Sequence, residues 1–107
     1  MNKKISISNS AIQKNLRRIV NQIYKLLPCR EESLDWQAPL TTIIEELIGM
    51  NDLIEDENFF SLICKLQGLL HLTAEDDFFL YRRIIFECLS LLNKILNNFK
   101  EEDIWVD

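Results

Sequence analysis

Residues 73–99 read TAEDDFFLYRRIIFECLSLLNKILNNF, and their large apolar side chains recur at alternating steps of three and four. The recurring positions are Phe78, Tyr81, Ile85, Cys88, Leu92, Ile95 and Phe99. This is a heptad spacing, which buries one side of a helix along its whole length. Thr73 and Asp76 have the spacing of a capping box, so the helix is expected to open there. The pattern predicts a C-terminal helix of roughly 25 residues, or ~38 Å.

The N-terminal third of the chain also has a helical pattern, apolar on one side and basic on the other. Its apolar positions are Ile12, Leu16, Ile19, Val20, Ile23 and Leu27. We expect this helix to begin between Ser8 and Ser10, because hydroxyl oxygens cap free amide groups, and to end at Pro28. Its basic face consists of Lys14, Arg17, Arg18 and Lys25.

Two shorter helical segments lie between these long ones. One is expected to begin at Gln37 or Pro39 and to end at Gly49, since glycine is common just past a helix. The other spans 59–70, where Gly68 would allow a close contact with another helix. The chain has only two glycines and two prolines, too few for the many turns of an all-β protein. The sequence therefore predicts an all-α fold, an antiparallel bundle of about four helices with a long C-terminal helix.

The length of the chain predicts one helical domain over residues 1–107, with flexible ends at 1–8 and 101–107. No apolar run is long enough to span a membrane, and the N-terminus lacks the apolar core of a secretory signal. The cysteines are odd in number and have apolar neighbours, so we expect buried, reduced thiols in a cytoplasmic protein. These cysteines are Cys29, Cys64 and Cys88.

The helix predicted at 73–99 is apolar around more of its circumference than three shorter neighbours could cover. Exposed apolar surface of this kind is typical of a contact with another protein chain. We therefore expect this helix to form an interface, either in a homodimer or with a different protein. Phe86 and Leu89 lie off the heptad positions and are expected to face that partner.

The chain lacks the residue clusters that catalysis or cofactor binding requires. Its single histidine, His71, lies between two leucines near the predicted end of a helix, and no two cysteines have the close spacing of a zinc site. Gly49 and Gly68 are too far apart to form a glycine-rich phosphate loop. The sequence predicts no catalytic residue, no cofactor and no metal, and so a protein that is not an enzyme.

Charge is divided unevenly along the chain, whose net charge is −5. The first 30 residues contain seven basic residues and no acid, whereas the rest contain five basic residues and all 17 acids. Because complementary charge favours association, the acidic clusters and one tryptophan of the acidic tail are the predicted partner-binding residues. They are Glu45, Glu46, Asp52, Glu55, Asp56, Glu57, Glu75, Asp76, Asp77 and Trp105.

The basic face of the first helix has two interpretations. Lys14, Arg17, Arg18 and Lys25 either form a solvated face, paired with acids of the same chain, or bind nucleic acid. The first is favoured, because the net charge is negative and exposed aromatic residues are not interleaved with the basic positions. The expected partner is therefore a protein, rather than nucleic acid or a membrane.

In its size, acidity, helical content and Asn/Ile/Lys-rich composition, the chain resembles the small immunity proteins of bacterial toxin systems, including those of contact-dependent growth inhibition. This resemblance implies tight binding to one cognate toxin, usually a basic nuclease, by an acidic surface that imitates nucleic acid. The alternative is a small helical subunit of a ribonucleoprotein or a phage-derived assembly. In that role the basic face of the first helix would meet RNA or the acidic face of a neighbour.

Overall fold

The computed structural model describes the backbone of residues 2–54 and 56–106, and the surroundings of the side chains of 10–54 and 56–98. Within these residues there is no β-strand, which confirms the all-α prediction. The helical elements are α1 (Asn2–Glu31), α2 (Gln37–Met50), α3 (Glu57–Leu69), the short 3₁₀ helix η1 (Glu75–Asp77) and α4 (Phe78–Val106).

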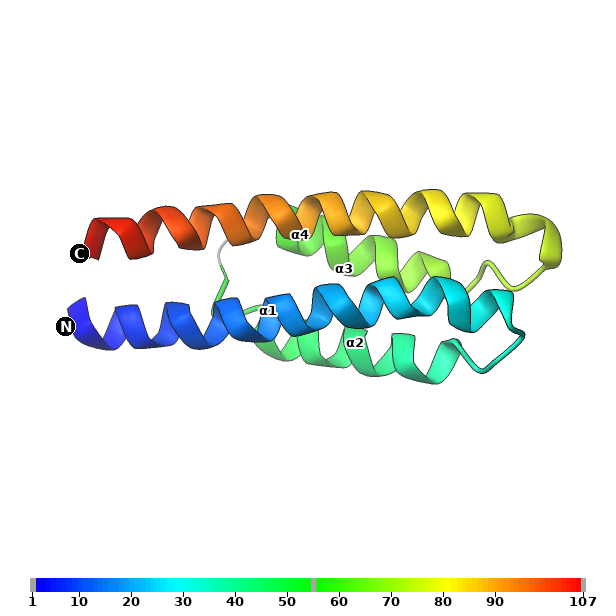
Figure 1. Cartoon of the computed structure of the whole chain (residues 1–107), viewed down its shortest axis with the longest axis horizontal. Coiled ribbons are helices and arrows are strands. Elements are labelled where there is room, and N and C mark those ends of the chain that lie inside the picture. The colour runs from blue at the N-terminus through cyan, green and yellow to red at the C-terminus, as the bar shows by residue number, and fades with distance from the viewer. Residues whose placement is uncertain (1, 55, 107) are drawn as a thin grey trace.

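The four α-helices form an antiparallel bundle in which each helix contacts the next one along the chain and α1 also contacts α4. The two long helices, α1 and α4, lie side by side, and the shorter α2 and α3 cover the other side of the pair (Figure 1). The bundle measures 50 × 20 × 20 Å. Helix α1 begins and α4 ends at the same end of the bundle, where both project beyond α2 and α3 (Figure 1).

The core contains the periodic apolar side chains of all four helices. From Tyr81 to Ile95, the heptad positions predicted in the last helix are completely buried, and they pack against a matching stripe of α1. Burying each large apolar side chain contributes about 1.5–3 kcal/mol relative to leaving it in water, so this core dominates the stability. The fully buried residues of α1 are Leu16, Ile19, Ile23 and Leu26.

The predicted limits of the first helix are wrong at both ends. Helix α1 begins at Asn2 rather than between Ser8 and Ser10, and it continues through Pro28 to Glu31. Proline is tolerated here because it lies in the last turns, where its missing N–H removes only one helical hydrogen bond. The helix is terminated just after Glu31 by Ser33, which has a left-handed φ of 60°.

Hydrogen bonds around Ser33 form a Schellman motif, the usual way in which a helix ends on a left-handed residue. The amide of Leu34 donates to the carbonyl of Cys29 at 2.9 Å, and the amide of Ser33 donates to the carbonyl of Arg30 at 3.0 Å. Glycine is the usual residue at such a position, and no glycine marked this one in the sequence. The end of α1 was therefore not visible from residue types alone.

The two glycines also differ from prediction. Gly49 lies inside α2, which ends on Asn51 with ordinary helical dihedral angles, so it is not a cap. Gly68 makes no close helix contact, because a methyl group built on its Cα would meet nothing within 4 Å. Both positions are exposed to solvent. Neither glycine is required by the packing.

The start of the last helix is shifted by one residue from the predicted capping box of Thr73 and Asp76. Asp77 Oδ2 accepts a hydrogen bond from the amide of Ala74 at 3.2 Å, and the amide of Asp77 donates to the carbonyl of Ala74 at 3.0 Å. The helix therefore enters through the single turn of η1. Asp77, rather than Asp76, satisfies the free amide group at its start.

The interface prediction assumed that the last helix is longer than all its neighbours, and this assumption is wrong. Helix α4 has 29 residues, whereas α1 has 30 and packs along it. Leu89 is buried in the core, so of the two residues expected to face a partner only Phe86 is exposed. The excess of apolar surface on α4 is therefore smaller than its sequence suggests.

The predicted burial of the cysteines is confirmed at only one of the three positions. Cys88 is buried, Cys29 is partly buried and Cys64 is exposed. The flexible ends predicted at 1–8 and 101–107 fall almost entirely on residues whose side-chain surroundings lie outside the description, as does Trp105. None of the helices in the described part of the chain combines the length and the apolarity of a membrane span.

Candidate partner-binding faces

Helix packing sorts the charges of the chain onto opposite faces of the bundle. The segment 37–69, which comprises α2, α3 and their connection and is called the acidic hairpin below, contains six acids and one basic residue. The segments 10–30 of α1 and 78–98 of α4, called the basic pair, together contain eight basic residues and one acid. The middle of the sequence thus forms an acidic face, and parts of its first and last helices form a basic one.

The structure separates the acids that were predicted to form one binding surface. Glu45, Glu46, Asp52, Asp56 and Glu57 all belong to the acidic hairpin, whereas Glu55 lies outside the described residues. The second acidic group is at the opposite end of the bundle, on the connection that leads into α4 (Figure 1). It consists of Glu75, Asp76 and Asp77.

Two of these acids have structural roles at helix starts. Asp56 is the N-cap of α3, where Oδ1 accepts a hydrogen bond from the amide of Asn58 at 2.8 Å. Its Oδ2 accepts a second hydrogen bond, from Nδ2 of Asn98 on α4, at 3.2 Å. At the entry to α4 the carboxylate of Asp77 instead reaches back and accepts a hydrogen bond from the amide of Ala74, three residues before it. Acids at these positions also stabilise the helix dipole, so they need no partner to explain them.

Glu46 is engaged by one cation of the basic face. Both of its carboxylate oxygens accept hydrogen bonds from the guanidinium of Arg18, which joins α2 to α1. This hydrogen bond and the charge of Glu46 raise the pKa of Arg18. The predicted pairing of the basic face with acids of the same chain is therefore confirmed for Arg18. No ion pair within the described residues involves Lys14, Arg17 or Lys25.

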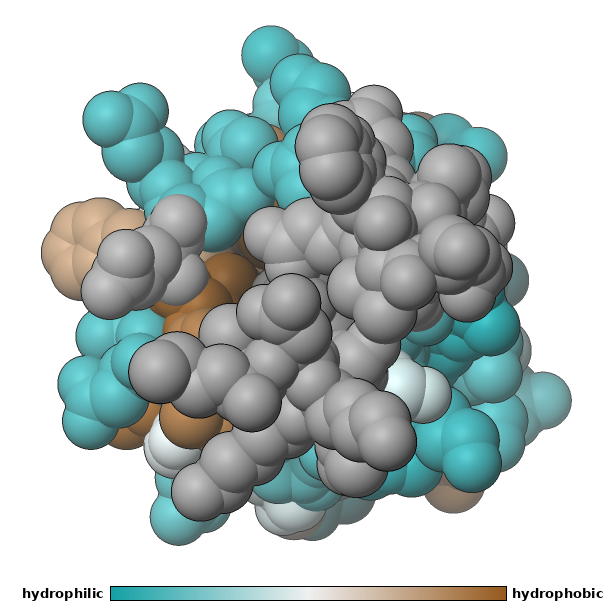
Figure 2. Space-filling view, turned by 90° about the vertical axis from the view of Figure 1, so that its left-hand side faces the viewer, coloured by the Kyte–Doolittle hydropathy of each residue, from teal (hydrophilic) through white to brown (hydrophobic). Residues whose placement is uncertain are grey.

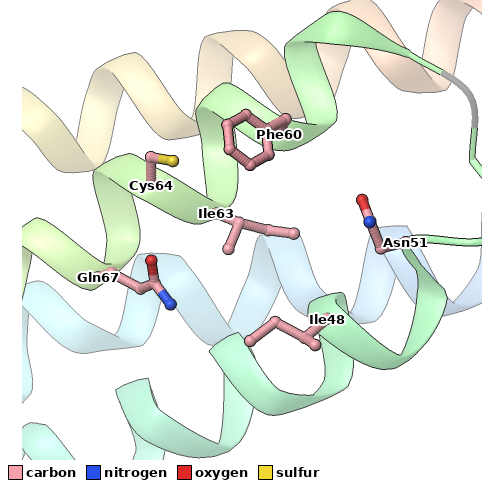
Figure 3. A pocket seen from close by; sticks show the side chains of 6 residues that line it. All are labelled: Ile48, Asn51, Phe60, Ile63, Cys64 and Gln67. Atoms are coloured by element: carbon pink, nitrogen blue, oxygen red, sulfur yellow. The ribbon is translucent and has the colours of Figure 1, made fainter.

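A shallow groove of about 260 Å³ runs between α2 and α3 on the outside of the acidic hairpin. Ile48 on α2 and Phe60 and Ile63 on α3 line it with apolar side chains (Figure 3), together with Asn51, Cys64 and Gln67. Phe60 is 65% exposed and Ile48 is 50% exposed. Figure 2, which views the bundle from the end that carries both termini, shows hydrophobic surface gathered on one side among hydrophilic surface.

The sequence patterns did not assign this groove to any function. Helix α3 is apolar around most of its circumference, and adjacent phenylalanines therefore cannot be assigned to the core or the surface by type. In the structure Phe59 is completely buried, whereas Phe60 points into the groove (Figure 3). The available signal was an excess of apolar positions beyond one stripe, which a helix in a bundle does not need.

At the other end of the bundle, Arg30 forms a clamp that sequence reasoning also missed. Its guanidinium donates hydrogen bonds to the carbonyls of Leu72 and, at 2.8 Å, of Ala74. It stacks 4.8 Å from the ring of Trp36 and 4.4 Å from that of Tyr81. Cations over aromatic faces are attracted by the ring quadrupole. Arg30 thus ties the α1–α2 connection to the connection before α4.

Trp36, which is partly buried, belongs to this clamp. Its ring meets that of Tyr81 edge to face, with centroids 5.0 Å apart. The hydroxyl of Tyr81 is buried and has no hydrogen-bond partner among the described residues. Burial raises the pKa of Tyr81 to about 12, although the nearby charge of Arg30 opposes this shift.

Exposed aromatic rings lie on the basic pair, contrary to the prediction that none is interleaved with the basic positions. Tyr24, seven residues after Arg17 on α1, is 51% exposed. On α4, Phe79 is 80% exposed and Phe86 is 44% exposed, with the guanidinium of Arg82 5.2 Å above the Phe86 ring. The sequence patterns left Tyr24 and Phe79 unassigned, whereas Phe86 was expected to be exposed and to face a protein partner.

The described residues contain no cluster of three or more His, Cys, Asp or Glu side chains that could hold a metal ion. His71 is exposed in the turn after α3, where its amide donates to the carbonyl of Gly68 at 3.1 Å. Burial raises the pKa of the Cys88 thiol to about 12, which keeps it protonated and unreactive at neutral pH.

The geometry therefore offers two surfaces for binding: an apolar groove on the acidic hairpin and an aromatic, basic face on the α1–α4 pair. The acids at 75–77 and the Arg30 clamp lie at the end of the bundle away from the termini (Figure 1). No protein-family model, curated protein or solved structure matches this chain.

Proposed function

We propose that this protein is a non-enzymatic inhibitor that binds and neutralises a protein toxin domain with a basic surface, as small immunity proteins do. The observation that carries the proposal is the exposed groove of Ile48, Phe60 and Ile63 on a hairpin with six acids and one basic residue. Aromatic side chains that can enter a partner's pocket supply most of the affinity of protein interfaces. Acids around such an anchor steer a basic partner toward it.

Three acids of the hairpin are available for this role. Glu45, Asp52 and Glu57 are exposed, and none of them forms an ion pair within the described residues. Glu45 precedes Ile48 by three positions, so it lies one turn along the same side of α2. Asp52 and Glu57 flank the connection between α2 and α3. A partner that covers the groove would therefore meet these carboxylates at the edge of the interface.

The test measures binding to the protein encoded by the adjacent gene, together with the survival of cells that express both proteins. Reversing Asp52 and Glu57 to Lys should slow association about tenfold at low salt, with a smaller effect at ~0.5 M salt. Phe60→Ala should speed dissociation by about thirtyfold or more, as expected for an interface anchor.

The matched controls lie away from the groove. Leu34→Ala removes a side chain of similar exposure on the α1–α2 connection, and reversing Glu31 and Glu32 to Lys removes the same charge there. Both controls should leave the two rate constants within about twofold. Full protection of cells by the Phe60→Ala variant and by the double reversal, at the lowest expression level, would exclude this face from inhibition.

The alternative function, a structural subunit of a ribonucleoprotein or phage-derived assembly, uses the basic face of α1 instead. The exposed cations Lys14, Arg17 and Lys25 support it, whereas Arg18 is engaged by Glu46. A homodimer through α4 remains a prediction, now supported by Phe86 alone of the two residues first expected to face a partner. The cytoplasmic location also remains a prediction.

A further inference from the structure

The exposed aromatic residues of the basic pair are three separate rings that no apolar groove explains. Tyr24, Phe79 and Phe86 expose about half of their surface or more, although phenylalanine is a residue that folding normally buries. Each ring lies in one of the two segments of the basic pair, 10–30 and 78–98, whose charged residues are almost all basic. Their arrangement in space shows whether they form one surface.

On α1, the ion pair with the hairpin identifies the side that bears Tyr24. Arg18 contacts Glu46 of α2, so this flank of α1 faces the acidic hairpin. Tyr24 follows Arg18 by six residues and is therefore about 120° away around the helix. Arg17 precedes Tyr24 by seven residues, two helical turns, and shares its side. Tyr24 and Arg17 thus lie on the flank of α1 that faces away from α2.

On α4, an ion pair with α3 identifies the side of the helix that faces the hairpin. Glu87 forms an ion pair with Lys65 of α3 at 3.1 Å, so its flank of α4 faces the hairpin. Phe86 is about 100° away from Glu87 around the helix, and Phe79 precedes Phe86 by two turns. Both phenylalanines therefore lie on the flank of α4 that faces away from α3.

The height of the rings along the bundle follows from the Arg30 clamp. The guanidinium of Arg30 contacts the ring of Tyr81, which places these two residues at the same level of the antiparallel helices. Tyr24 is six residues before Arg30, and Phe86 is five residues after Tyr81, distances of about 9 and 7.5 Å in the same direction. Tyr24 and Phe86 therefore lie at nearly the same level of the α1–α4 pair.

Cations surround these rings without internal partners. Arg17 and Arg82 are exposed and form no ion pair within the described residues, as is also true of Lys14. Glu87 is the one acid in these parts of α1 and α4, and it is held on the flank toward α3. The remaining exposed side chains of this face are uncharged hydrogen-bonding groups: Asn21, Ser90, Asn93 and Asn97.

We infer that this outer face of α1 and α4 binds single-stranded nucleic acid, with the phosphates on Arg17 and Arg82 and unpaired bases stacked on Tyr24 and Phe86. Proteins bind single strands in this way, with a basic track for the backbone and aromatic rings for the bases. The face lies apart from the groove proposed to bind a toxin. The net charge of −5 does not oppose this binding, because residues 10–30 and 78–98 contain eight basic residues and one acid.

The chemistry of the face favours this ligand over an acidic protein or a duplex. An acidic protein would be anchored by a continuous apolar patch, whereas Phe79 and Phe86 are roughly 10 Å apart along the helix with arginines between them. A duplex offers phosphates but no exposed base faces, and would leave the rings in water. A single strand offers both kinds of contact, because its unpaired bases can stack on the rings and its phosphates can pair with the cations.

The experiment measures binding of the full chain to a fluorescein-labelled 15-nucleotide oligothymidylate by anisotropy, at several salt concentrations. We expect binding in 50 mM salt, with a slope of log affinity against log salt of about −1.4, near −0.7 for each of two phosphates neutralised. Tyr24→Ala with Phe86→Ala should weaken binding about tenfold or more at every salt concentration. Arg17→Gln should reduce the magnitude of the slope by about 0.7.

Two controls separate this face from general charge and from unfolding. Lys65→Gln removes one positive charge on the flank toward α3, and Leu34→Ala removes an exposed side chain elsewhere; each should change affinity by less than about twofold. All variants should keep the helical circular dichroism signal. Equal affinity for a 15-residue polyglutamate, equal affinity for a duplex, or unchanged affinity of the Tyr24→Ala, Phe86→Ala protein would each overturn the inference.

Discussion

The acidic hairpin and the basic pair bury the same kinds of side chain in one core, yet their outer surfaces differ in almost every respect. The hairpin presents a groove lined by Ile48 on α2 and Phe60 on α3, and its free charges are carboxylates. The basic pair presents separate rings between arginines and asparagines. The periodic apolar residues of the core thus determine which helices pack together. The outer residues are not constrained by this packing, so they can differ between the two faces.

The hairpin itself contains the sharpest contrast, between two adjacent phenylalanines. Phe59 is completely buried, and Phe59→Ala should reduce the free energy of unfolding by about 3–5 kcal/mol, through lost burial and the cavity left behind. Phe60→Ala, on the exposed side, should change it by less than about 0.5 kcal/mol. Urea denaturation measures both. Similar losses for the two variants would mean that the groove is part of the core, and would remove the main support for the hairpin as a binding face.

The fold was largely predictable from the sequence, because helical periodicity is a local property of the chain. The heptad positions from Tyr81 to Ile95 and the stripe of α1 lie in the core as predicted. The end of α1 could not be predicted, since Ser33 adopts a conformation that glycine usually supplies. The prediction that this helix ends at Pro28 was wrong. Proline lacks one helical N–H, and α1 continues for three residues past it despite that lost hydrogen bond.

The candidate sites were less predictable, because they depend on which helices become neighbours. The acids at 45–57 and 75–77 are close in composition and were grouped together, but the antiparallel topology carries them to opposite ends of the bundle. Conversely, Tyr24 and Phe86 are 62 positions apart in sequence and reach the same level only through the packing of α1 on α4. No periodicity within one helix contains that information.

The next prediction concerns the clamp that joins the two regions at the end of the bundle away from the termini. Arg30→Met keeps much of the aliphatic length but removes the hydrogen bonds to the carbonyls of Leu72 and Ala74 and the stacking on Trp36 and Tyr81. We expect a loss of about 1–3 kcal/mol in the free energy of unfolding, because charged hydrogen bonds and cation–π contacts are lost together. Arg30→Lys should recover only part of it, since an ammonium cannot stack and donate to both carbonyls at once. A loss below about 0.5 kcal/mol for Arg30→Met in urea denaturation would show that the two connections are held independently of Arg30.

A smaller, stabilising effect is expected in the hairpin at Gly49. The residue lies within α2, is exposed, and has room for a methyl group, since nothing lies within 4 Å of the position where a Cβ would be. Gly49→Ala should therefore raise the free energy of unfolding by about 0.5–1 kcal/mol, chiefly by reducing the freedom of the unfolded chain. The matched control is Ala38→Gly near the start of the same helix, which should lower stability. If Gly49→Ala were destabilising, α2 would have to end before Gly49, as the sequence first suggested.

The smallest effect at neutral pH is expected for Tyr81→Phe in the basic pair, and it should grow with pH. The hydroxyl is buried without a partner among the described residues, so its removal should change the free energy of unfolding by no more than about 0.5 kcal/mol, in the stabilising direction. Because burial raises the pKa of Tyr81 to about 12, the folded protein keeps this phenol neutral between pH 10 and 12, whereas the unfolded chain ionises it near pH 10. The stability that depends on the neutral phenol is complete below pH 10 and is lost as the pH rises toward 12. The buried thiol of Cys88, whose pKa is also raised to about 12, adds a loss that begins near pH 9 and is common to both proteins. The advantage of Tyr81→Phe over the parent should therefore increase between pH 8 and pH 10.5 in thermal denaturation. A difference in melting temperature that does not change with pH would mean that water reaches the Tyr81 hydroxyl, and that this end of the α1–α4 pair is more open than the Arg30 clamp implies.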